Sequence, residues 1–78
     1  MKSVLASAKY KGDTNDFVHG KDYMIEVANT PEGEIVVNEL KHKGGDNYTS
    51  TGISIRYVST VSFLIDWDDV HSYPTISL

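Results

Sequence analysis

Apolar and polar residues alternate along most of this chain, and this period of two constrains its fold more than any other feature. Successive side chains of a β-strand point to opposite faces of the sheet, whereas a helical face repeats about every 3.6 residues. Each alternating stretch therefore predicts a strand with one buried face. The stretches contain Val4, Ala6, Ala8 and Tyr10; Tyr23, Ile25 and Val27; and Ile53, Ile55 and Tyr57.

Turn-forming residues separate these stretches. The clusters at 12–16, 19–22 and 29–33 are made largely of glycine, proline, asparagine and aspartate, which favour chain reversal. Residues 34–40 are rich in β-branched side chains and predict a further strand, which the short 29–33 loop joins to its predecessor as a hairpin. Residues 41–52 are polar and glycine-rich, and they form either a wide mobile loop or the tip of a long hairpin.

The stretch 59–67 fits two structures. Phe63 and Trp67 are four residues apart, which suits one or two helical turns laid across the sheet. Apolar residues also alternate from Val61 to Trp67, which suits a fifth strand. The sequence leaves both structures open. Residues 68–78 are weakly patterned, and we expect them to form a weakly structured C-terminal tail.

These signals together predict an all-β fold. A chain of 78 residues has room for a single domain. We expect residues 1–67 to form one small β-barrel of four to five antiparallel strands, with a short helical turn near 59–67 as an option. Closure into a barrel is favoured because it removes the exposed edges of an open sheet.

The composition narrows the range of functions. The chain carries 11 acidic and 7 basic side chains, and its formal net charge of -4 is opposite to the basic excess of a generic polyanion binder. It has no cysteine, which excludes disulfides, thiolate zinc sites and cysteine nucleophiles. A small chain without disulfides fits the reducing cytoplasm. The sequence shows neither a secretory apolar region nor the roughly 20 apolar residues of a membrane-spanning helix, so we expect a cytoplasmic protein without a membrane partner.

A set of short motifs is similar to a layout found in small phage and prophage proteins. Tyr10-x-Gly12 is followed by Phe17-x-x-Gly20-Lys21-x-Tyr23-x-Ile25-x-Val27, and then by Tyr57, Phe63 and Trp67. Proteins of that group, most of them uncharacterised, typically form SH3-like barrels. The resemblance covers residues 4–67 and implies an SH3-like barrel in a phage setting. It carries over no catalytic residues, and the polar stretch 41–52 is longer than in the usual layout.

Residues suited to metal or acid–base chemistry are present without a recognised arrangement. An acidic run from Asp66 to Asp69, followed by His71, offers oxygen and imidazole ligands, but it lacks the spacing and the sharp-turn glycine of a calcium loop. A solvated acidic turn is the simpler interpretation. The three histidines are far apart and match no ligand or catalytic spacing. We therefore predict a non-enzymatic protein with no metal site and no cofactor.

Protein binding is the leading functional hypothesis. A small β domain with an exposed strand edge and aromatic residues near one terminus is typical of docking modules. Trp67 is the best candidate anchor because aromatic residues dominate binding hot spots, whereas Phe63 more simply caps the open end of the barrel. Neighbouring carboxylates would steer the protein toward basic partners. We expect a host or phage protein as the partner, with a homo-oligomer as a further option; the predicted partner-binding residues are Asp66, Trp67, Asp68 and Asp69.

A nucleic-acid-binding β-barrel is the alternative. Such barrels stack bases on exposed aromatic rings beside basic side chains. Two of the tyrosines, Tyr23 and Tyr57, would equally well fill the core with their hydroxyls at its rim. The net charge opposes the alternative, although a local basic face could survive it. The candidate rings are Tyr10, Tyr23, Tyr48 and Tyr57, and the candidate phosphate contacts are Lys9, Lys11, Lys41, Lys43 and Arg56.

Overall fold

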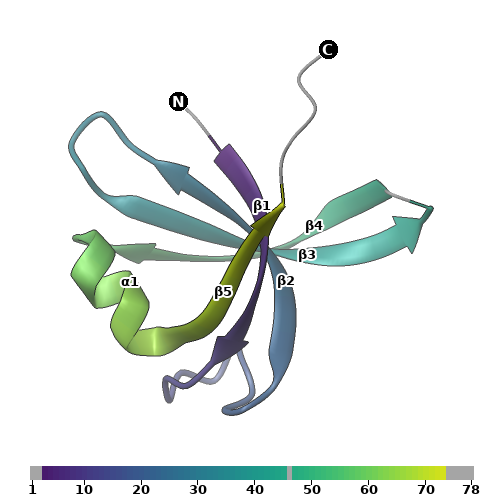
Figure 1. The fold of residues 1–78 in the computed structure, drawn as a ribbon, viewed down its shortest axis with the longest axis horizontal. Helices are drawn as coiled ribbons and strands as arrows, with labels where there is room; N and C mark the ends of the chain where they lie inside the picture. The colour runs from purple at the N-terminus through teal and green to yellow at the C-terminus, as the bar shows by residue number, and fades with distance from the viewer. Residues whose placement is uncertain (1–2, 46, 74–78) are drawn as a thin grey trace.

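The computed structural model describes residues 3–45 and 47–73, which form five β-strands and one short helix (Figure 1). All five strands belong to one sheet, which confirms the predicted all-β fold. In chain order the elements are β1 (Ser3–Tyr10), β2 (Asp22–Asn29), β3 (Ile35–Gly44), β4 (Asn47–Tyr57), α1 (Thr60–Asp66) and β5 (Trp67–Tyr73).

The sheet is antiparallel and open. Its strand order is β4-β3-β2-β1-β5, so β4 and β5 lie at the two edges. Within the described residues no ladder joins β4 to β5, and the closed barrel expected from the sequence is corrected to an open sheet. The reason is that the connection between these two strands folds as α1, which lies close to both of them where a closed barrel would have a ladder.

The core lies on the face of the sheet that the alternation predicted. Ala6, Ala8 and Tyr10 of β1 point inward and are buried, while their neighbours in the strand are more exposed. Aromatic rings fill the remaining volume around Trp67, whose ring centroid lies 5.0 Å from that of Tyr10 and 5.1 Å from that of Phe17. The buried cluster consists of Ala6, Ala8, Tyr10, Phe17, Ile25, Ile35, Val37, Tyr57, Phe63 and Trp67.

The polar stretch 41–52 belongs to a long hairpin, which decides between the two options left by the sequence. β3 and β4 stay paired as far as Gly44 opposite Asn47. β2 accompanies β3 only as far as Leu40, so the outer part of the hairpin projects from the sheet as a two-stranded ribbon (Figure 1). We call residues 41–45 and 47–49 the hairpin arm.

Helix α1 begins because Ser59 caps it. The Ser59 side chain accepts a hydrogen bond from the backbone N–H of Ser62, which satisfies one of the donors that a helix N-terminus leaves unpaired. The helix ends at Asp66, and Trp67 returns to extended backbone. The ambiguous stretch 59–67 is therefore helical through Asp66.

Strand β5 corrects the expectation of a weakly structured tail. Its residues pair with β1 in antiparallel register, from Trp67 opposite Tyr10 to Tyr73 opposite Leu5. The domain therefore extends through Tyr73 rather than ending at residue 67. The remainder of the predicted tail, residues 74–78, lies outside the described residues.

Candidate functional site

Trp67, the predicted surface anchor, belongs to the core. Only 1% of its surface is exposed, and its ring packs on Tyr10, Phe17 and Phe63. A side chain in that position cannot serve as a docking anchor while the domain is folded. Phe63 is also buried, as a structural rather than a recognition residue, although the sheet is not the barrel whose open end it was expected to cap.

Asp66 likewise has a structural role, because it ends a chain of hydrogen bonds that joins β4 to β5. The Trp67 indole Nε1–H donates to the Tyr57 hydroxyl over 2.9 Å, and that hydroxyl donates to Asp66 Oδ2 over 2.9 Å. Burial, followed by the hydrogen bond to Asp66, raises the pKa of the Tyr57 hydroxyl well above its ordinary value. The phenol therefore stays protonated, and the chain of hydrogen bonds holds α1 in place.

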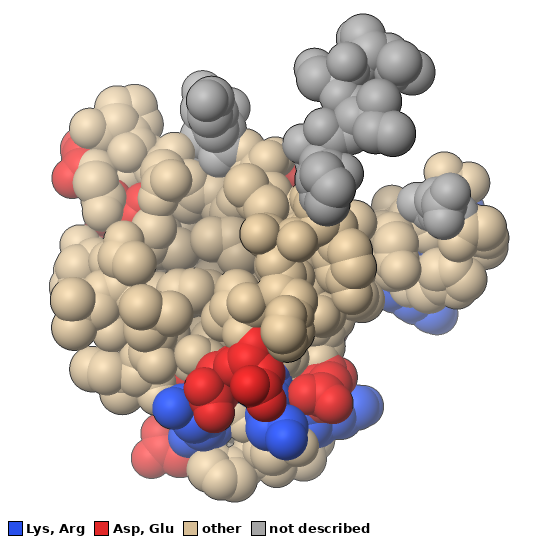
Figure 2. Space-filling view, in the orientation of Figure 1, with Lys and Arg blue, Asp and Glu red and all other residues tan. Residues whose placement is uncertain are grey.

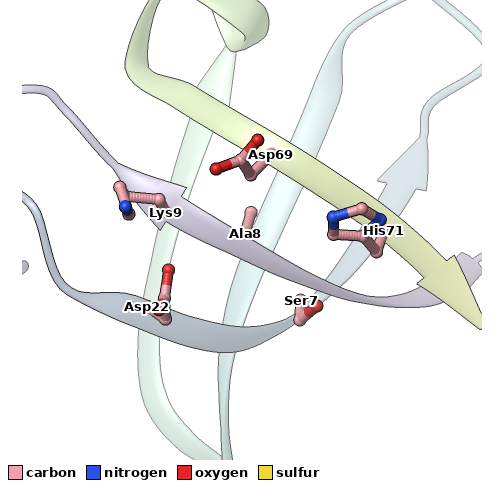
Figure 3. Close-up of a pocket in the computed structure, with 6 residues that line it drawn as sticks. All are labelled: Ser7, Ala8, Lys9, Asp22, Asp69 and His71. Atoms are coloured by element: carbon pink, nitrogen blue, oxygen red, sulfur yellow. The ribbon is translucent and has the colours of Figure 1, made fainter.

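Asp68 and Asp69 are exposed on β5, where a β-bulge changes the direction of their side chains. Asp69 and Val70 together stand opposite the single residue Ala8, between the pairs Ser7–His71 and Lys9–Asp68. Asp69 has a φ of 50°, in the left-handed region that aspartate enters more readily than most residues. The bulge directs the Asp69 carboxylate over β1 (Figure 3).

Asp69 thereby borders an open groove of about 390 Å³ across β2, β1 and β5 (Figure 3). Ser7, His71 and Asp69 are residue types found together in hydrolases, but the Ser7 hydroxyl accepts its hydrogen bond from Tyr73, over 3.4 Å. Within the described residues, 3–45 and 47–73, no hydrogen bond joins His71 to Ser7. No three His, Asp or Glu side chains among them are placed to hold a metal ion. The groove is lined by Ser7, Ala8, Lys9, Asp22, Asp69 and His71.

The largest concentration of exposed apolar side chains lies on and before α1. Val61, Leu64 and Ile65 of the helix are 70%, 51% and 66% exposed, and Val58, just before it, is 77% exposed. Phe63 alone of the helix is buried, so the helix turns one aromatic ring inward and three aliphatic side chains outward. Figure 2 shows an uncharged surface where α1 lies in Figure 1. We call Val58, Val61, Leu64 and Ile65 the α1 patch.

The residues proposed for nucleic-acid binding are dispersed. Tyr10 and Tyr57 are buried, and Lys9 lies between Asp22 and Asp68 in the sheet. Arg56 makes an exposed ion pair with Glu34 at 3.5 Å. The hairpin arm carries both kinds of group: the His42 and Tyr48 rings are in edge contact with centroids 5.3 Å apart. The exposed Lys41 and Lys43 flank His42 in β3, where successive side chains point to opposite faces of the ribbon.

The chain matches no protein-family model, no curated protein and no solved structure. Helix α1 has seven residues, and none of the described segments forms a helix with the length and apolarity of a membrane span.

The α1 patch was not predicted from the sequence, because residues 59–67 fitted both a strand and one or two helical turns. In a strand, Val61 and Ile65 would share a face with Phe63 and point inward; in the helix they point outward. The composition of the segment did contain a signal for exposed apolar side chains. The segment from Val61 to Trp67 holds five apolar residues in seven, more than one face of a single small element can bury.

Proposed function

We propose that this protein is a non-enzymatic protein-interaction module and that it docks through the α1 patch. The observation that supports this most strongly is the exposure of its four aliphatic side chains, each at least half exposed and all within residues 58–65. Exposed apolar clusters on small proteins mark interaction sites, whereas single exposed apolar residues are ordinary.

The patch is carried by a well-supported element, which suits recognition. The buried Phe63 ring holds α1 against the core. Hydrogen bonds through Tyr57 connect Asp66, the last residue of α1, to Trp67 in the core. A partner would therefore meet a preformed surface and would not have to order it, which reduces the entropic cost of binding.

The partner that we propose is a phage or host protein met in the host cytoplasm. What supports the phage setting is the resemblance of the motifs to those of small phage and prophage proteins. The exposed carboxylates of Asp68 and Asp69 follow α1 closely in the chain and favour a partner with basic residues beside its apolar contact.

Site-specific photo-cross-linking tests this proposal. A photoreactive residue at position 64 should give a discrete cross-linked product in host lysate, and the product should disappear when Val61 and Ile65 are both changed to Gln. The matched control places the same residue at Val18, which is 61% exposed but lies outside the patch. Equal products from positions 64 and 18 would refute docking at the patch.

Nucleic-acid binding remains the second candidate, and the hairpin arm is what favours it. A two-stranded ribbon can enter a nucleic-acid groove, and this one carries the exposed Lys41 and Lys43 as well as the Tyr48 ring. Retention on immobilised single-stranded or duplex DNA at low salt, lost in the Lys41→Gln/Lys43→Gln variant, would support it. No retention at low salt would exclude it, because phosphate contacts are strongest there.

A further inference from the structure

We propose that the open groove across β2, β1 and β5 binds an arginine side chain of the partner between the carboxylates of Asp22 and Asp69. The inference deepens the proposed function and rests on it, because it names the partner group that meets the acidic residues after α1. The groove and the α1 patch have no residue in common, so the two surfaces can be tested separately.

Two carboxylates border the groove from opposite sides of β1. Asp22 begins β2 and stands opposite Lys9 in the ladder, so both side chains lie on the outer face of the sheet. Asp69 reaches the same groove from β5, on the other side of β1 (Figure 3). A cationic group placed over β1 therefore meets a carboxylate on each side.

The bulge in β5 supplies the second of these carboxylates. Asp68 and His71 stand opposite outer-face residues of β1, which leaves one inward position between them. Two residues share that position: Val70 packs against the core, and the extra residue, Asp69, lines the groove. A regular strand would have supplied the inward residue alone, so the bulge adds an acidic group to the outer face without removing one from the core.

The charges around the groove are available to a ligand. The described residues form a single ion pair, between Arg56 and Glu34, and neither of these lines the groove. Asp22 and Asp69 are both exposed. The lining carries these two carboxylates against the one ammonium group of Lys9, so its complement is a cation.

An arginine side chain suits this lining better than a metal ion or a lysine. The described part of the chain places no three ligands around a metal ion, whereas a volume of about 390 Å³ has room for an organic head group. A planar guanidinium has five N–H donors in a fixed fork, so it can contact carboxylates on two sides at once, which a compact ammonium group does less well. Lys9 carries a like charge and weakens the binding of any cation there.

An NMR titration of the isotope-labelled protein with a blocked tripeptide that has a central arginine tests the proposal. The same peptide with citrulline in place of arginine keeps the shape and removes the charge. In about 0.1 M salt, which screens distant charges, we expect saturable shifts of the amides that line the groove. The expected Kd is about 1 mM, because exposed ion pairs are weak, and the citrulline peptide should not saturate.

Substitutions locate the site. Asp22→Asn and Asp69→Asn should each weaken binding by about threefold or more, and asparagine at 69 tolerates the positive φ of the bulge. Asp68→Asn is the matched control, because it makes the same charge change one residue away and outside the lining; it should weaken binding by less than about twofold. Lys9→Gln should strengthen binding by about twofold or more. Circular dichroism checks the fold of each variant.

Binding that requires the arginine charge and follows this order of variants supports the proposal. It is overturned if no saturable shifts occur, if the citrulline peptide binds as tightly, or if Asp68→Asn and Asp69→Asn lose equally, since net charge alone then acts. A Lys9→Gln variant that binds no more tightly overturns it as well. A titration that fails while position 64 still cross-links removes the groove alone, and the reverse result removes the α1 patch alone.

Discussion

Helix α1 and strand β5 are adjacent in the chain, yet the side chains that they expose to solvent differ in chemical character. Three of the exposed positions of α1 are aliphatic, whereas β5 has two exposed aspartates and a bulge directly after the buried Trp67. The difference follows from how many backbone N–H and C=O groups each element leaves without a hydrogen-bond partner. β5 is an edge strand whose outer N–H and C=O groups could pair with another chain, and charge and bulges are the usual means of preventing that.

The backbone of α1 needs no such protection, because a helix satisfies most of its own hydrogen bonds. Exposed apolar side chains there can bind a partner by packing without offering a template for strand addition. The comparison shows that one short segment, residues 58–73, carries four of the five described aliphatic side chains that are at least half exposed, together with a sheet edge protected by charge and a bulge.

The largest predicted effect concerns the inward side of this segment. Trp67→Ala should destabilise the fold by about 3–5 kcal/mol, because it removes a large buried ring from the centre of the core. Urea denaturation measures the change. A loss below about 1 kcal/mol would place Trp67 outside the core and reopen its role as a surface anchor.

The hydrogen bonds between β4 and β5 should give the next largest effect. Tyr57→Phe leaves the buried Trp67 Nε1–H without its acceptor, at a cost of about 1–3 kcal/mol. Tyr73→Phe is the matched control, since the Tyr73 hydroxyl is exposed and its hydrogen bond to Ser7 is long. Urea denaturation measures the loss in unfolding free energy. Equal losses from both variants would contradict a stabilising role for the hydrogen bond between Trp67 and Tyr57.

The same hydroxyl makes stability depend on alkaline pH. The pKa of Tyr57 is raised in the folded state above its ordinary value of 10.0, so the unfolded chain gives up this proton more easily. The stabilisation is complete below pH 10 and is lost progressively above it. Wild type minus Tyr57→Phe should therefore show a stability difference that shrinks above pH 10, and a constant difference would contradict the shifted pKa.

Much of this fold could be predicted from the sequence because period two is a local signal. The alternation in β1 and β2 placed Ala6 and Ile25 on the inward face, where the structure has them, and β-branched residues predicted β3. The outer hairpin and β5 were harder. Their exposed residues lack an apolar face, so pairing rather than burial defines them, and pairing depends on partners far away in the chain.

The candidate site was missed for a related reason. Val61, Phe63 and Ile65 alternate as a strand would, and only the choice of a helix turns two of them outward. That choice depends on the Ser59 cap and on the hydrogen bonds of Tyr57, which fix the path between two sheet edges. The hypothesis drawn from the sequence placed the surface anchor at Trp67, which is buried, and gave no role to the exposed aliphatic side chains of the helix.

A smaller effect, with the opposite sign, is expected at the β5 bulge. Asp69→Gly should stabilise the fold by about 0.5–1 kcal/mol, because glycine adopts a positive φ without the steric cost that aspartate bears there. Asp68→Gly, one position earlier, should destabilise it, since only Asp69 among the described non-glycine residues has a positive φ. Thermal unfolding of the two variants measures the contrast, and destabilisation by both would mean that the Asp69 carboxylate makes a stabilising contact.

The smallest effect on stability is expected on the outward side of α1, and it completes the comparison. Leu64→Gln and Ile65→Gln should each change the free energy of unfolding by no more than about 0.5 kcal/mol, because both side chains are at least half exposed and glutamine is a good helix former. Urea denaturation at low protein concentration measures this change in the free energy of unfolding. If instead these variants lose as much stability as Tyr57→Phe, the aliphatic side chains of α1 stabilise the folded domain. Their presence would then be explained by stability, without a docking surface.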